Sequence, residues 1–153
     1  MNNKQNLNEI AKKIVKNTFK TNNIGFIDMD NTIKIVKKTT KLIDKNSGEI
    51  IKKIEKEERR ENIKAPFNIL INNKGIKIKA SKIHNNEVNC LLAQDNKSFI
   101  DFLIIVVLSD NNELLSYYLF EKSYLRGYKA LNFNIDKFIG LNDEDLVYLF
   151  KNI

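Results

Sequence analysis

The chain has few of the residue types that usually mark a specialised site. Its 153 residues include no tryptophan and only one cysteine, one histidine and one proline. A single cysteine, Cys90, excludes an internal disulfide, and this composition is typical of a protein kept in a reducing cytoplasm. Since His84 has no second histidine nearby, we expect a surface residue and not a metal ligand. Glycine-rich phosphate loops, Cys/His zinc spacings and Ser/His/Asp nucleophile motifs are also missing.

Long apolar runs are missing as well. The longest, at 102–108, is far shorter than the roughly 20 residues that a membrane-spanning helix needs. The N-terminal residues 1–6 lack the apolar region of a signal peptide. Hydrophobic residues nevertheless make up 42% of the chain, which is enough for a buried core. We therefore expect a cytoplasmic globular protein without membrane association, with residues 1–153 forming one domain.

Positive charge is concentrated in the first part of the chain. The net charge is +7, with 26 Lys and Arg against 19 Asp and Glu. Residues 1–64 contain 16 basic and 9 acidic residues, whereas residues 65–153 contain 10 of each. An excess confined to one region is the footprint expected for contact with phosphate groups. The alternative is a set of solvated helix faces in a lysine-rich protein.

Three basic helices are predicted before residue 62. Asn6 or Asn8 can cap a helix that runs to about residue 20, with an apolar stripe at i, i+3 and i+4 spacing. A second helix, capped by Asp30 or Asn31, is expected to run to about residue 43, although its many β-branched residues weaken the pattern. After a turn at 46–48, a third helix, capped by Ser47, is expected over 48–61, where Glu and Lys alternate at i, i+4 spacing. Residues 1–46 would then form a basic helical part and residues 47–153 the core.

Short apolar strands and a closing helix are predicted after residue 65. Residues 66–71 and 76–81 indicate two strands joined by a tight turn at 72–75, which reads Asn-Asn-Lys-Gly. Residues 100–108 indicate a central strand that is covered on both faces, and 114–120 indicate another strand. Acidic residues that follow Asn142 favour the start of a C-terminal helix, and its apolar residues, Leu146, Val147, Leu149 and Phe150, should pack on the core. The predicted fold class is α/β (α+β), with helices first and then a mixed sheet of four or five strands.

The stretch 66–81 carries the most specific signal. Alternate side chains of a strand point to the same face, so Lys77 and Lys79 should project together while Ile76 and Ile78 enter the core. Asn68, on the neighbouring strand, can meet that polar face across the turn. We therefore expect Asn68 and Lys79 in one polar pocket with Lys77 beside them. An ordinary amphipathic hairpin with lysines on its wet face is the alternative.

This stretch, with the strand that begins Asp101-Phe102, resembles the PD-(D/E)XK nuclease superfamily, and the similarity covers roughly residues 47–153. The resemblance implies a restriction-endonuclease-like fold in which two acids hold Mg²⁺ and a lysine orients the attacking water. Lys79 matches the lysine, but Asn68 and Lys77 stand at the acid positions. Glu49 matches an acid that such nucleases often carry on an earlier helix, although a first-turn acid favoured by the helix dipole is the stronger explanation. An intact homologue would use Mg²⁺, whereas no metal ligand set is predicted for this sequence.

The predicted function is that of a DNA-binding protein of the PD-(D/E)XK endonuclease type, inactive as written. Double-stranded DNA is the expected partner, and a homodimer is an assembly that the resemblance allows. One alternative is a non-catalytic DNA- or protein-binding module on a decayed nuclease fold. Another is a small helix-turn-helix regulator with a sheet domain for dimerisation. The residues expected to contact nucleic acid are basic: Lys52, Lys53, Arg59, Arg60, Lys64, Lys82 and Arg126.

Overall fold

The computed structural model describes residues 6–30, 33–43, 46–48, 50–62, 65–92, 95 and 97–153. The chain divides into two compact units. The core unit contains Met1–Asp30 and Pro66–Ile153, and the hairpin unit contains Asn31–Ala65. The boundary predicted between residues 46 and 47 therefore falls inside the hairpin unit.

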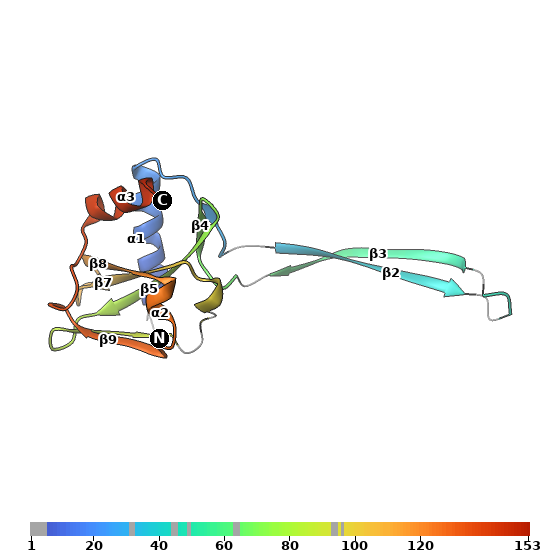
Figure 1. The fold of residues 1–153 in the computed structure, drawn as a ribbon. Helices are drawn as coiled ribbons and strands as arrows, with labels where there is room; N and C mark the ends of the chain where they lie inside the picture. Colours follow the sequence, from blue (N-terminus) through green and yellow to red (C-terminus); the bar gives the residue numbers. More distant parts are fainter. Residues whose placement is uncertain are drawn as a thin grey trace. The chain divides into compact units, whose positions relative to one another are not determined.

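The core unit contains helices at both ends and strands between them (Figure 1). No helix in the described part of the chain is long and apolar enough to cross a membrane. The elements are α1 (Leu7–Thr21), β1 (Ile27–Asp28), β4 (Ile69–Ile71), β5 (Lys74–Lys82), β6 (Glu87–Leu91), the 3-10 turn η1 (Lys97–Phe99), β7 (Phe102–Leu108), β8 (Leu114–Glu121), α2 (Lys122–Leu125), β9 (Ala130–Asn134) and α3 (Asp143–Lys151).

A mixed five-stranded sheet forms the centre of this unit. Its strand order is β1-β4-β5-β7-β8. Strands β5 and β7 are parallel, with Ile78 opposite Ile104, whereas the other neighbouring strands are antiparallel. A two-residue turn joins β4 to β5, and both of its residues have positive φ, 48° at Asn72 and 63° at Asn73. Asparagine tolerates this backbone better than most residues. A tight turn is therefore confirmed at this place, but it is shorter than the predicted 72–75, because Lys74 and Gly75 belong to β5.

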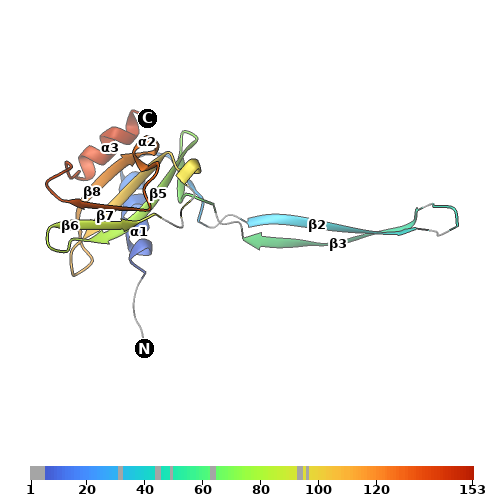
Figure 2. The same cartoon turned by 60° about the horizontal axis from the view of Figure 1, so that its bottom comes forward.

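Two hydrophobic layers cover the faces of this sheet. On one face α1 and α3 pack against the sheet through Phe19 and Phe150, whose rings lie 5.1 Å apart. On the other face the β6–β9 pair contributes Val88 and Phe133 to a second core. Figure 1 shows α1 and α3 on one side of the sheet and β9 on the other, and Figure 2 brings the side that carries β6 forward. The buried strand β7 supplies alternate residues to both layers, which confirms the prediction of a strand covered on both faces.

Asparagine side chains cap both α1 and α3, and the cap of α1 was predicted. The Asn6 side chain accepts a hydrogen bond from the backbone of Asn8 at 3.0 Å. At α3, Asn142 and Asp145 form a capping box, with each side chain accepting from the other's backbone N–H. A cap of this kind satisfies N–H groups that have no partner inside the helix. The structure thus confirms an α+β fold with an N-terminal helix, a mixed five-stranded sheet and a C-terminal helix.

The hairpin unit corrects the prediction for the second and third helices. Residues Ile33–Ile43 form β2 and residues Ile50–Asn62 form β3, and the two strands pair in an antiparallel ribbon (Figure 1). The predicted turn at 46–48 is present, and Gly48 has φ +70°. The β-branched residues in both segments favour strands, and this preference outweighs the helical spacing of the apolar positions.

Candidate functional site

Asparagine side chains complete the edge of β5 where β4 stops. Strand β4 pairs with β5 only as far as Ile76. The backbone N–H groups of Ile78 and Ala80, farther along β5, therefore have no β4 residue opposite them. The Oδ1 atom of Asn68 accepts from Ile78 N at 2.7 Å, and Oδ1 of Asn8 in α1 accepts from Ala80 N at 2.9 Å. Both amide oxygens therefore replace the carbonyls that a longer β4 would have provided, so these backbone donors keep a partner.

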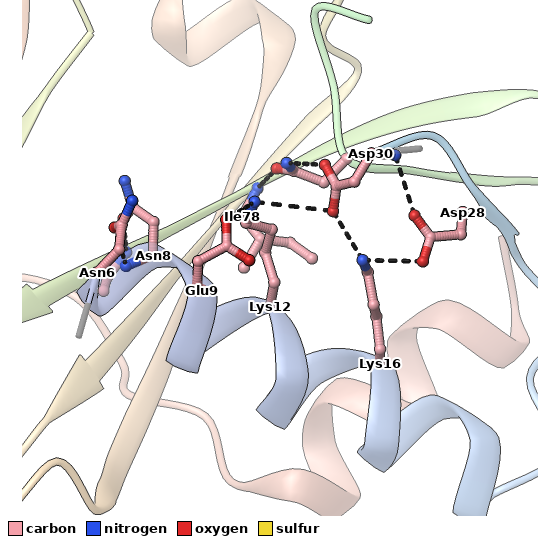
Figure 3. Close-up of polar contacts among 10 residues, drawn as sticks. Asn6, Asn8, Glu9, Lys12, Lys16, Asp28, Asp30 and Ile78 are labelled. Carbon is pink, nitrogen blue, oxygen red and sulfur yellow. Dashed lines mark hydrogen bonds and ion pairs between the residues drawn. The ribbon is translucent and has the colours of Figure 1, made fainter. Parts of the chain in front are cut away.

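Asn68 also binds a charged cluster beside α1, which we call the Asp30 cluster and define as Lys12, Lys16, Asp28, Asp30 and Asn68. The Nδ2 group of Asn68 donates to Oδ1 of Asp30 at 2.8 Å. The other carboxylate oxygen of Asp30, Oδ2, accepts a hydrogen bond from Nζ of Lys16 at 2.7 Å. Nζ of Lys16 also lies 3.0 Å from Asp28 (Figure 3). The two lysines are four residues apart on α1, so they lie on one face of the helix.

The charges of this cluster stabilise one another. Burial disfavours the ionised form of Asp30, but the hydrogen bonds from Asn68 and Lys16 outweigh it and hold the pKa of Asp30 below its usual value. Burial likewise opposes the charge on Lys16, and contacts with Asp30 and Asp28 nevertheless raise its pKa. Asp30 therefore acts as an ionised anchor near neutral pH.

Lys77 and Lys79 project together to the other face of the sheet, as the alternation of the strand predicted. Nζ of Lys79 lies 2.5 Å from Asp95, and Nζ of Lys77 lies 3.9 Å from the same carboxylate. Lys79 also donates to the backbone oxygen of Leu91 in β6. Burial lowers the pKa of Lys77; Asp95 opposes this effect and Lys79 adds to it. Asn68 and Lys79 contact different residues. No direct contact described here therefore links Asn68 to Lys77 and Lys79, the other two nuclease-like positions.

The residues at the predicted ligand positions do not fit Mg²⁺. Both polar atoms of Asn68 are engaged, one with Ile78 N and the other with Asp30. Lys77 presents an ammonium group, which repels a divalent cation. Glu49 lies outside the described residues. Among the described residues, no group of three or more His, Cys, Asp or Glu side chains is arranged to hold a metal ion.

The residues predicted to contact nucleic acid fall in different parts of the fold. Lys52, Lys53, Arg59 and Arg60 all belong to β3 of the hairpin unit. Lys64 lies outside the described residues. In the core unit, Nζ of Lys82 donates to the backbone oxygen of Asp110 at 3.4 Å. Arg126 is exposed and lines a surface groove together with Lys74 and Lys122.

Sequence reasoning missed the two carboxylates that organise the polar contacts of the core unit. Asp30 was expected to cap a helix, and Asp95 was not expected to take part in a site. The Asp28-Met29-Asp30 spacing beside a short apolar segment was a usable signal for the first, because alternate residues share one side of an extended chain. Asp95 offered no such signal, since it lies in a loop after β6 and only the folded structure brings it to Lys79.

Comparisons with protein-family models, with curated proteins and with solved structures found no match for this chain. The resemblance to PD-(D/E)XK nucleases, which covers roughly residues 47–153, therefore stays a prediction.

Proposed function

We propose that this chain is a DNA-binding protein whose hairpin unit contacts the phosphate backbone of duplex DNA without cutting it. The supporting observation is the distribution of charge between the two units. Residues 31–65 contain 11 Lys and Arg against 6 Asp and Glu, so this segment alone carries +5 of the total net charge of +7. Such a local excess attracts polyanions and speeds their encounter with the protein.

The form of the hairpin unit suits a nucleic-acid groove. An antiparallel two-stranded ribbon is one of the two elements that the major groove of B-DNA admits. The shorter strand, β2, has 11 residues, which corresponds to about 36 Å at the usual rise per residue. That length matches about one turn of the DNA helix. The ribbon could therefore follow a groove over most of a turn.

The strand register favours an anionic partner. In the ribbon, Lys38 is paired with Lys56 and Lys41 with Lys53. Like charges at directly opposite positions destabilise a β ladder, and an isolated two-stranded hairpin is only marginally stable in water. Bound phosphate groups would relieve this repulsion. Binding would then stabilise the ribbon as well as hold the DNA.

The residues at the nuclease-like positions support binding without hydrolysis. A PD-(D/E)XK enzyme needs acids where this chain has Asn68 and Lys77, and their contacts leave neither position suited to Mg²⁺. We propose that any relationship to such enzymes survives in the fold and in DNA contact alone. A non-catalytic protein-binding module is the remaining alternative, and an acidic protein surface would be its partner.

Fluorescence anisotropy with a labelled 30-base-pair duplex tests the proposal. The test variant carries Lys38→Gln, Lys41→Gln, Lys53→Gln and Lys56→Gln. A control variant loses the same charge from exposed lysines of the core unit, through Lys13→Gln, Lys20→Gln, Lys137→Gln and Lys151→Gln. We expect the test variant to lower the slope of log K against log salt by about 0.9 for each lysine that contacts a phosphate. The control variant should keep a slope of log K against log salt close to that of the original protein.

Two results would overturn the proposal. Equal losses in both variants would show that net charge and not the ribbon attracts DNA. No binding of the original protein at 50 mM salt, where such contacts are strong, would favour the protein-partner alternative. Incubation with supercoiled plasmid and Mg²⁺ tests the proposal that the protein does not cut DNA. We expect no nicking beyond that seen with EDTA.

A further inference from the structure

A compact basic and aromatic segment lies in the otherwise neutral half of the chain. Residues 122–129 read Lys-Ser-Tyr-Leu-Arg-Gly-Tyr-Lys, with three basic residues and no acid. The segment comprises α2 and the turn that follows it. Its charge is thus a local feature that the hairpin unit does not explain.

The fold turns this segment into a pair of stacked rings. Leu125 is buried and fixes the segment on the core, and the backbone N–H of Tyr128 donates to its carbonyl at 3.2 Å. Gly127 has φ +86°, a conformation that other residues adopt only with strain. The chain therefore bends back, and the rings of Tyr124 and Tyr128 lie 5.5 Å apart and nearly parallel, at 11°.

The inner ring of the pair is held firmly. Tyr124 packs against Phe120 with 5.2 Å between ring centroids and against Phe138 at 5.7 Å. Phe120 belongs to the second hydrophobic core. The outer ring, Tyr128, is 45% exposed. A rigid inner ring with an exposed outer ring presents a flat aromatic surface to solvent.

The segment itself and η1 also carry cations and a further exposed ring. Lys97 donates from Nζ to the backbone oxygen of Tyr128, which ties η1 to the turn. Phe99, also in η1, is 60% exposed. Arg126 and Lys129 are exposed on either side of Tyr128 in the chain. Flat rings combined with cations are the features that hold single-stranded nucleic acid, because bases stack on the rings and phosphates pair with the cations.

We infer that the Tyr124–Tyr128 pair, with Arg126 and Lys129, is a stacking site for unpaired bases of single-stranded DNA. A base pair inside a duplex cannot present its face to Tyr128, so the occupant must be unstacked. Glu121 precedes the segment and lines one groove with Lys122 and Arg126, but the charge of residues 121–129 is still positive, with three basic residues and one acid. A local positive charge of this kind favours a polyanion as the partner. This inference goes beyond the duplex contact proposed for the hairpin unit and does not depend on it.

Binding of a labelled 15-mer of deoxythymidine tests the site, followed by anisotropy and by quenching of tyrosine emission. Tyr128→Ala should weaken binding about 5- to 100-fold, the usual effect of removing one stacking ring. Tyr128→Phe keeps the ring and should bind like the original protein. Tyr148→Ala, at a tyrosine on α3 that is 70% exposed, is the matched control and should have no effect.

An abasic oligonucleotide of the same length separates stacking from charge. We expect the original protein to bind it no better than Tyr128→Ala binds the 15-mer. Equal affinity of the original protein for the abasic strand and for the 15-mer would overturn the inference, as would equal effects of Tyr128→Ala and Tyr148→Ala. When Tyr128→Ala is added to the variant with four hairpin lysines replaced, it should weaken binding of the 15-mer by a similar factor even where duplex binding is lost. The two proposals therefore fail separately.

Discussion

The carboxamide of Asn68 donates to the carboxylate of Asp30 at 2.8 Å while its oxygen accepts from the backbone of Ile78. Only an amide can serve both partners, because a carboxylate accepts hydrogen bonds and cannot donate to Asp30. We expect Asn68→Asp to lower the free energy of unfolding by about 1–3 kcal/mol at pH 7, the usual cost of losing a buried hydrogen bond and adding repulsion. Urea denaturation of the variant and of the original protein measures this difference in the free energy of unfolding.

A control variant separates this donor role from the simple addition of charge. Asn8→Asp makes the same chemical change in α1, where Oδ1 accepts from Ala80 N and a carboxylate can still accept. Asn8 also lies in the first turn of the helix, where the helix dipole favours a negative charge. We therefore expect Asn8→Asp to leave the free energy of unfolding unchanged or to raise it slightly. Equal losses from both variants would contradict the role assigned to Asn68.

The Lys16–Asp30 pair makes stability depend on pH at both ends of the scale. The lowered pKa of Asp30 gives stability that is present above its unfolded value near 3.8 and is lost as pH falls through the folded value. The raised pKa of Lys16 gives stability that is present below 10.5 and is lost as pH rises through the folded value. Lys16→Gln should therefore cost about 1 kcal/mol between these limits.

Denaturation of Lys16→Gln at several pH values tests this dependence. The difference from the original protein should shrink as pH falls below 3.8 and through the lowered pKa of Asp30. Lys13→Gln, at an exposed lysine of the same helix, should show no comparable change with pH. A difference that stays constant from pH 7 to the acid end of the series would show that Lys16 acts through packing alone.

Tyr117 connects β8 to the start of α3. Its ring is fully buried, and its hydroxyl donates to Asp143 at 2.7 Å and lies 3.4 Å from the hydroxyl of Thr18. Burial is the main cause that raises the pKa of Tyr117, and Asp143 adds to it. Tyr117→Phe should lower the free energy of unfolding by about 1 kcal/mol. Tyr148→Phe should be neutral, since that side chain is largely exposed.

Cys90 should be inert in the folded protein. Its side chain is buried in the second core, and burial raises the pKa of the thiol from 9.0 to about 11. Since the thiolate is the reactive form, this shift alone slows reaction with a maleimide about 100-fold at pH 8. Mass spectrometry before and after addition of urea measures the two rates. Equal rates would mean that β6 opens readily from the sheet.

The sequence predicted those elements whose local signals agree with their surroundings. Helix α1 has a capping asparagine and one apolar stripe, and β7 is a continuous apolar run. The alternation in β5 also predicted which lysines share a face. In each case the pattern within one segment is enough to determine the environment of its side chains.

Prediction failed where two patterns coincided or where partners came from distant segments. Residues 50–61 have apolar spacing and Glu–Lys pairs that a helix would use, yet the same residues pair across a ribbon, with Lys34 opposite Glu61. One residue of α3, Leu149, was expected in the core but is 38% exposed. The Asp30 cluster and the Asp95 contacts join residues far apart in the chain, and no local pattern encodes such pairs.

The hairpin unit is inserted between two strands that are neighbours in the sheet. Strands β1 and β4 pair directly, with Ile27 opposite Leu70, and the backbone N–H of Met29 donates to the carbonyl of Asn68 at 2.9 Å. The chain therefore leaves the core and returns to it at adjacent points. Evolution could lengthen, shorten or exchange such an insertion without rebuilding the sheet, so the segment that carries most of the positive charge could diverge faster than the fold that bears it.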